Sequence, residues 1–166
     1  MTTIQRGMKM GSKLQNVERS RTADMAETAT AACIAQRVRR MSRIITRVYD
    51  DSLRPLGITA SQFTLLTQLA QRDGVTASEI GHGLDIEKST LSRNLKRLLA
   101  LNLIKMDPPA GRRGRGLHLT VTGDSTIVSA YPVWQEAQSR ALAVMGDRSR
   151  ETLDGMLSQA EKLCAA

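Results

Sequence analysis

Aromatic residues are scarce in this 166-residue sequence, and their scarcity disfavours one mode of nucleic-acid binding. The four aromatic residues are Tyr49, Phe63, Tyr131 and Trp134. None of them lies in the basic segment described below, so unpaired bases would find no aromatic ring to stack on there. Any contact with nucleic acid is therefore expected to involve a duplex, through its backbone or a groove.

Cysteine and long apolar runs are also in short supply. Cys33 and Cys164 lie far apart in the sequence, which argues against a disulfide framework. The apolar runs are much shorter than a membrane span. Charges recur at Arg6, Lys9 and Lys13, where a signal peptide would have its apolar core. We expect a cytoplasmic, reduced protein with no membrane partner.

The rest of the composition is that of an ordinary globular protein, with 41% hydrophobic and 24% charged residues. A chain of this length can bury roughly 70% of its extended surface in a core. One domain, or one and a half, is the expected size class.

The net charge of +8 is concentrated in particular segments. Residues 87–116 hold eight Lys and Arg against two acids, a net charge of +6, and residues 1–22 hold five against one, a net charge of +4. A solvated surface usually mixes the two signs, whereas a surface that faces phosphates is basic. The segment 87–116 is thus the candidate contact with nucleic acid.

Helical periodicity dominates the first third of the chain. The apolar residues Ile34, Val38, Met41, Ile45 and Val48 are spaced by four and three residues, which places them on one face of a helix. Asp24 with Glu27 predicts the start of this helix, and Pro55 with Gly57 predicts its end.

Three further helices are predicted before residue 102. Thr59–Gln62 and Thr76–Glu79 have the pattern of capping boxes and begin two short helices. A leucine stripe predicts another helix over Glu87–Leu101, and Asn102 can adopt the left-handed conformation that ends it.

A hairpin is predicted next, followed by two helices. Residues 103–106 and 117–121 are predicted strands, joined by a loop that carries Arg112, Arg113 and Arg115 among glycines. Beyond Thr122 a long helical pattern contains Pro132, which should kink the helix, and a last helix follows it.

The helix over 87–101 has two different faces. Leu91, Leu95 and Leu98 lie on one face, and hydroxyl and cationic side chains occupy the rest. Arginine can bind guanine or phosphate bidentately, and short hydroxyls near a helix N-terminus can reach phosphates or base edges. A plain solvated face explains the same charges equally well. The candidate DNA-reading residues are Ser89, Thr90, Ser92, Arg93, Lys96 and Arg97.

The basic hairpin favours the DNA-binding interpretation. Arg112, Arg113 and Arg115 on a hairpin tip suit the negative potential of a narrow minor groove. The predicted fold is mostly α-helical, a winged helix-turn-helix with a small β-hairpin wing. Its predicted parts are a basic arm or disordered tail (1–22), an N-terminal dimerisation helix (23–58), the DNA-binding region (59–121) and C-terminal dimerisation helices (122–166).

The sequence over about 34–145 resembles the multiple-antibiotic-resistance regulator (MarR) family of winged helix-turn-helix repressors. The residues that carry the resemblance lie in 53–63, 78–84 and 88–98 and at the end of the wing, 117–123. The resemblance implies a homodimer formed by the first and last helices, a pseudo-palindromic operator and release by a small ligand. The family keeps an Asp-x-Arg in the wing; here Arg113 holds the arginine position, and Gly111 stands in place of the aspartate.

Other candidate sites are weaker. Cys33, one turn before Arg37, is a candidate redox residue by resemblance to hydroperoxide-sensing relatives, although a small buried residue explains it better. Tyr49 and Trp134 are candidate contacts for an aromatic effector, with core packing as the alternative. No metal site, cofactor or enzymatic motif is expected.

The predicted function is a sequence-specific transcriptional regulator, a probable repressor, that acts on double-stranded DNA as a homodimer. Three alternatives remain open at this point: a non-specific architectural DNA binder, a redox-sensing repressor that uses Cys33, and a winged helix that binds an acidic protein partner.

Overall fold

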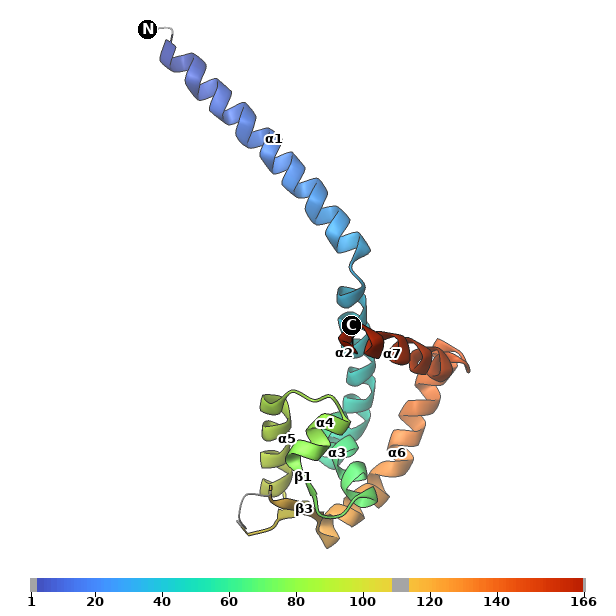
Figure 1. The fold of residues 1–166 in the computed structure, drawn as a ribbon. Coiled ribbons are helices and arrows are strands. Elements are labelled where there is room, and N and C mark those ends of the chain that lie inside the picture. The colour runs from blue at the N-terminus through green and yellow to red at the C-terminus, as the bar shows by residue number, and fades with distance from the viewer. Residues whose placement is uncertain (1–2, 109–113, 166) are drawn as a thin grey trace. The chain divides into compact units, whose positions relative to one another are not determined.

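The computed structural model describes residues 3–108 and 114–165, in which the chain is mostly helical with one small antiparallel sheet. It forms two compact units, up to Ile44 and from Ile45 onward. The elements, drawn in Figure 1, are α1 (Thr3–Ala32), α2 (Ile34–Leu53), η1 (Arg54–Leu56), α3 (Ala60–Gln71), β1 (Val75–Thr76), α4 (Ala77–Gly83), α5 (Lys88–Ala100), β2 (Ile104–Met106), β3 (Gly116–Leu119), α6 (Val121–Met145) and α7 (Ser149–Ala165).

The first unit is helical from its beginning, which corrects the sequence prediction. A helix start at Asp24 is wrong, because α1 begins at Thr3 and ends at Ala32. Residues 1–22 contain no proline and many good helix formers, so local propensity favours a helix over a disordered tail. The interpretation of this segment as an arm stays a prediction.

The second unit begins with the predicted short helices. Both capping boxes are confirmed: the hydroxyl of Thr59 accepts from the amide of Gln62, that of Thr76 accepts from the amide of Glu79, and both reciprocal bonds form. Each cap satisfies amides that the first turn of a helix leaves without a partner. The helix boundaries read from these residues therefore agree with the structure.

The sheet contains one strand more than predicted. Its order is β1-β3-β2, and β3 pairs with both neighbours in antiparallel fashion. The two-residue strand β1 is too short to show alternation, so no periodic pattern predicted it. Val121 lies outside β3, because Thr120 is the N-cap of α6 and accepts from the amide of Gly123.

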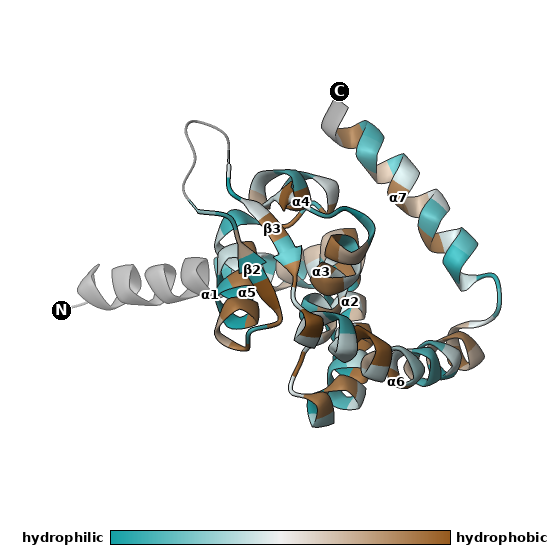
Figure 2. Cartoon of the chain, turned by 90° about the horizontal axis from the view of Figure 1, so that it is seen from below, coloured by the Kyte–Doolittle hydropathy of each residue, from teal (hydrophilic) through white to brown (hydrophobic). Residues whose placement is uncertain are grey.

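The core lies between α3, α5 and the sheet. Figure 2 shows how hydrophobic and hydrophilic residues alternate along the helices. Gly123 allows a close approach of α6, since a Cβ there would lie 2.1 Å from the carbonyl oxygen of Leu103. The core cluster consists of Leu53, Ile58, Phe63, Leu65, Leu66, Leu69, Val75, Ile80, Leu91, Leu95, Leu98, Leu103, Ile104, Leu117 and Ala130.

Helix α6 is continuous through Pro132, as the long helical pattern predicted, and the kink expected at this proline stays a prediction. The proline removes the hydrogen bond to the carbonyl of Val128. Val128 is 74% exposed, so water can satisfy that carbonyl and the helix continues. The last helix, α7, is present as predicted.

Candidate nucleic-acid interface

The turn between α4 and α5 holds the two helices in a defined arrangement. Ile86 donates its amide to the carbonyl of Gly81 (3.0 Å), and Asp85 adopts a positive φ of 49°. A Cβ on Gly81 would lie 3.1 Å from Leu91 on α5, so the helices are in close contact. With Gly81 and Leu91 packed together, the position of α5 is set by α4 and the core.

Helix α5 separates apolar from polar side chains as the sequence predicted. Leu91 and Leu95 are each 5% exposed, and Leu98 is fully buried. Five of the six predicted DNA-reading residues are exposed, and Thr90 is half-buried. The five exposed residues are Ser89, Ser92, Arg93, Lys96 and Arg97.

The N-terminus of α5 carries a contact that the sequence analysis missed. A carboxylate oxygen of Glu87 accepts from the amides of Ser89 (2.7 Å) and Thr90 (3.3 Å) and also from the Ser89 hydroxyl. Hydrogen bonds from the Ser89 side chain and then from the two amides lower the pKa of Glu87. Glutamate is not a preferred N-cap residue, so the pattern alone did not reveal this role. Ser89 therefore has an intramolecular partner as well as solvent access.

Arg93 is an exposed cation in the N-terminal half of α5. Its guanidinium donates to the Thr90 hydroxyl at 3.3 Å, which steadies a long side chain at little cost. Arg93 is thus held along the helix surface, in reach of a ligand that approaches the N-terminal half of α5.

The wing, here β2 and β3 with the intervening residues 107–115, is described only in part. Arg112 and Arg113 lie outside the described residues. Arg115 is exposed, and its Nε donates to the carbonyl oxygen of Asp107 on the opposite side of the hairpin. Backbone hydrogen bonding also joins the two sides, from the Asp107 amide to the carbonyl of Gly116 (2.9 Å).

His118, on strand β3 of the wing, lies between two aspartates. His118 Nδ1 is 2.9 Å from Asp73 Oδ1, and Nε2 is 3.1 Å from Asp107 Oδ1. Hydrogen bonding to Asp73 and then to Asp107 raises the pKa of His118. Asp73 is 45 residues away in sequence, so no spacing rule could have found this cluster.

The two candidate effector contacts each have a partner within the second unit. The Tyr49 hydroxyl donates to Gln138 Oε1, and burial raises the pKa of Tyr49. Trp134 lies between Phe63 and Tyr131, with ring centroids 6.1 Å and 5.9 Å away. Packing therefore accounts for Trp134, and the proposed contact with a ligand stays a prediction.

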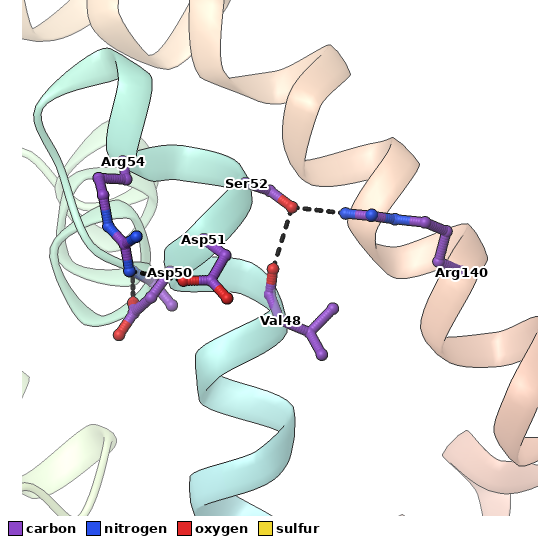
Figure 3. Close-up of polar contacts among 7 residues, drawn as sticks. Val48, Asp50, Asp51, Ser52, Arg54 and Arg140 are labelled. Atoms are coloured by element: carbon purple, nitrogen blue, oxygen red, sulfur yellow. Dashed lines mark hydrogen bonds and ion pairs between the residues drawn. The ribbon is translucent and has the colours of Figure 1, made fainter.

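Polar contacts join the second half of α2 to α6 and to the start of α3 (Figure 3). Arg140 on α6 donates to the Ser52 hydroxyl (2.6 Å), and Ser52 donates to the carbonyl of Val48 (3.0 Å). Asp50 accepts from the amide of Ala60 at 2.7 Å. These bonds connect α2 to α6 and to the start of α3.

A cavity of about 820 Å³ lies elsewhere, beside α5. Its lining comes from α4, α5 and Met106 and includes Leu95, Ser92 and Lys96. Neither Tyr49 nor Trp134 belongs to this lining.

Cys33 lies in the first unit, between α1 and α2. It is a free cysteine and half-buried, so the expectation of a small buried residue is wrong. The guanidinium of Arg37 donates to the backbone carbonyls of Cys33 (3.2 Å) and Ala31. Within residues 3–108 and 114–165, no three His, Cys, Asp or Glu side chains are placed to hold a metal ion.

Comparison with known proteins agrees with this geometry. The crystal structure of the M. tuberculosis transcriptional regulator MosR is 31% identical, covers 80% of this chain and 98% of its own, and superposes with a TM-score of 0.69. MosR in complex with DNA gives 30% identity, coverage of 81% and 99%, and a TM-score of 0.69. The apo form of MarR from E. coli, at 23% identity, coverage of 77% and 96%, and a TM-score of 0.60, supports the fold alone. No curated protein sequence gives a significant match.

A helix-turn-helix followed directly by a wing, with a cationic recognition face, defines the class of winged helix DNA-binding transcription regulators. Residues 56–114 also match the model described as the MarR family. The chain belongs to the MarR family. In the part of the chain that the structure describes, no helix is sufficiently long and apolar to cross a membrane.

Proposed function

We propose that this protein is a cytoplasmic, non-enzymatic transcriptional repressor that binds a pseudo-palindromic operator as a homodimer. The observation that carries the proposal is the exposed row of polar and cationic side chains on α5, mounted on a fully packed leucine stripe. A recognition helix needs this arrangement, since it must be rigid on one face and rich in hydrogen-bond donors on the other. The relative MosR, which has been solved with DNA, supports the choice of ligand.

The homodimer is proposed from apolar residues that the single chain leaves in solvent. Ile34 and Val38 on α2 are 76% and 53% exposed, and Met156, Leu157 and Leu163 on α7 are 62%, 62% and 82% exposed. Amphipathic helices bury such faces, and a second copy of the chain would supply the cover. The proposed dimer therefore uses helices α2 and α7.

Small-ligand control is part of the same proposal. Tyr49 and Trp134 are its candidate contacts, because both combine an apolar ring with a polar group on helices that support the DNA-binding region. Screening of aromatic acids by tryptophan fluorescence would test this, since Trp134 is the only tryptophan in the sequence. An unchanged spectrum together with an undisturbed protein–DNA complex would remove the pair from that role.

Footprinting on the promoter of its own gene or a neighbouring gene tests the central proposal. Two half-sites should be protected about one helical turn, roughly 10 base pairs, apart. Insertion of five base pairs, about half a turn, between them should abolish simultaneous binding and leave non-specific binding unchanged. Affinity should also fall on the order of 10³- to 10⁵-fold between about 50 and about 200 mM salt if 6–10 phosphates are contacted, as is roughly typical.

The control is a duplex of the same length and composition in scrambled order. If the insertion leaves the affinity unchanged at fixed salt, the symmetric repressor is excluded, and non-specific architectural binding explains the basic surface instead.

A further inference from the structure

The base of the wing is held together by His118, which connects three separate segments of the chain. Asp73 belongs to the turn between α3 and β1, Asp107 follows β2, and His118 lies on β3. Both aspartates face ring nitrogens, at 2.9 Å and 3.1 Å. His118 therefore connects the wing to the turn between α3 and β1.

The two contacts require the charged form of the imidazole. A carboxylate only accepts hydrogen bonds, and a neutral imidazole has a single N–H, so its second nitrogen would place a lone pair against a carboxylate oxygen. The imidazolium ion donates from both nitrogens. Protonated His118 can thus hold Asp73 and Asp107 at once, and neutral His118 can hold only one of them.

The surrounding backbone is built closely around this cluster. A Cβ on Gly116 would lie 2.5 Å from Asp107 Oδ2, 3.0 Å from the carbonyl oxygen of Gly74 and 3.3 Å from His118 Nε2. Only glycine leaves the Asp107 carboxylate room to lie against the neighbouring strand. A side chain at position 116 would force Asp107 or the turn at Gly74 to move.

Other charged groups lie on the elements around the cluster. The charges that act on the imidazole are those of Asp73 and Asp107. Lys105 on β2 is the cross-strand partner of His118. Arg115 donates to the carbonyl oxygen of Asp107, and Glu79, on the neighbouring α4, accepts from Thr76. Among these groups, histidine is the side chain whose charge changes near neutral pH.

We infer that His118 is a positioning residue for DNA binding: its protonated form clamps the wing to the turn between α3 and β1, and loss of the proton loosens the wing and weakens operator affinity. The inference rests on the proposed function. Arg112 and Arg113, the predicted minor-groove contacts, lie in the segment between Asp107 and Gly116. Arg115, an exposed cation of the wing, donates to the carbonyl oxygen of Asp107. A clamp that holds Asp107 therefore also restricts the position of Arg115, which reduces the entropy that DNA binding must overcome.

The sign of the pH dependence follows from the raised pKa of His118. A group whose pKa is higher in the folded protein stabilises it fully below the unfolded value, about 6.5 for histidine. That contribution is lost as the pH rises through the higher, folded value. Because only protonated His118 holds both aspartates, the inference expects DNA affinity to be greatest on the acidic side. His118 is 22% exposed, Asp107 53% and Asp73 79%, so solvent screening keeps the effect modest.

Operator affinity measured between about pH 5.5 and about pH 8.5 at constant salt tests the inference. The probe is the duplex protected in the footprint. We expect the wild-type Kd to rise by about three- to tenfold across this range, because His118 loses its proton and the wing is held less firmly. His118→Gln should bind weakly at every pH, and His118→Lys, which keeps the charge and several donors, should bind tightly with a flat profile. His82→Gln is the matched control and should keep the wild-type slope.

Histidine NMR provides a second readout that does not need DNA. The sequence has two histidines, so the His82→Gln variant shows the His118 signal alone. Its titration midpoint should lie above the ordinary histidine value and should fall when Asp73→Asn is added. Weak binding of His118→Gln with an unchanged pH slope would show a merely structural role and overturn the inference, as would a flat wild-type profile. Failure of the wild type to bind the promoter fragments at any pH would overturn the proposed function itself.

Discussion

Helices α5 and α2 carry the same kind of apolar pattern, but the stripe of α5 is buried and the first half of the stripe of α2 is exposed. On α5, Leu91, Leu95 and Leu98 are at most 5% exposed, because α3, α4 and the sheet cover them. On α2, Ile34 and Val38 are more than half exposed. Periodicity identifies a face that needs cover, but it does not say which chain provides the cover. The first stripe is completed within the chain, and we propose that a second copy completes the other.

The largest expected effect is a loss of folding stability when a leucine in the buried stripe of α5 is truncated. Leu98→Ala removes a fully buried side chain and should cost about 2–5 kcal/mol in the free energy of unfolding, from lost apolar contact and the cavity left behind. Chemical denaturation monitored by circular dichroism measures the loss. Val121→Ala is the control, because Val121 is 84% exposed and lies outside the helices proposed for the dimer, so its truncation should change the unfolding little. Equal losses for both variants would contradict the importance of burial for the leucine stripe.

A substitution in the exposed stripe of α2 should weaken dimer association. Val38→Glu places a charge in the proposed dimer interface and should weaken association by about 2 kcal/mol or more, roughly 30-fold in the dimer Kd. Sedimentation velocity over a concentration series measures this. Gln36→Glu adds the same charge on the opposite side of α2 and should leave the dimer intact. A Val38→Glu protein that stays as dimeric as the control would show that this stripe has another role.

The polar face of α5 should divide into residues that read bases and residues that hold phosphates. Arg93→Ala should cost about 1–3 kcal/mol on the operator and relax the preference at one position in each half-site. Lys96→Ala should weaken binding to all sequences to a similar extent. Fluorescence anisotropy with operator and scrambled duplexes separates the two effects. Equal losses on both duplexes for Arg93→Ala would remove Arg93 from the reading role.

The smallest expected effect is at the N-terminus of α5. The pKa of Glu87 is lowered by its bonds to Ser89 and Thr90, so its contribution to stability is present above the ordinary glutamate pKa and is lost as the pH falls through the lowered one. Glu87→Gln should therefore flatten slightly the decline of stability in acid. Thermal unfolding at a series of pH values tests this. The control is Glu136→Gln, at an exposed glutamate on α6. Identical curves for the wild type and Glu87→Gln would contradict the role of the cap.

Local rules were sufficient wherever neighbouring residues determine the outcome. The capping boxes at Thr59 and Thr76, the left-handed turn at Asn102 (φ 54°) and the leucine stripe of α5 were all predicted, because each depends on residues within about one helical turn. The same rules were wrong for the start of α1. There the helix propensity of the residues before Asp24 outweighed the capping pattern that the sequence suggested.

The sequence by itself determined the order of the helices, the leucine face and polar face of α5, and the concentration of positive charge between residues 87 and 116. Only the tertiary structure brought Asp73 and Asp107 to the two nitrogens of His118, added the short strand β1 to the sheet and showed that Val38 is left in solvent. The physical reason is the range of the interactions. Caps and periodic stripes act over a few residues, whereas a charge cluster or a strand pair depends on where distant segments meet, and that is decided by how the whole core packs.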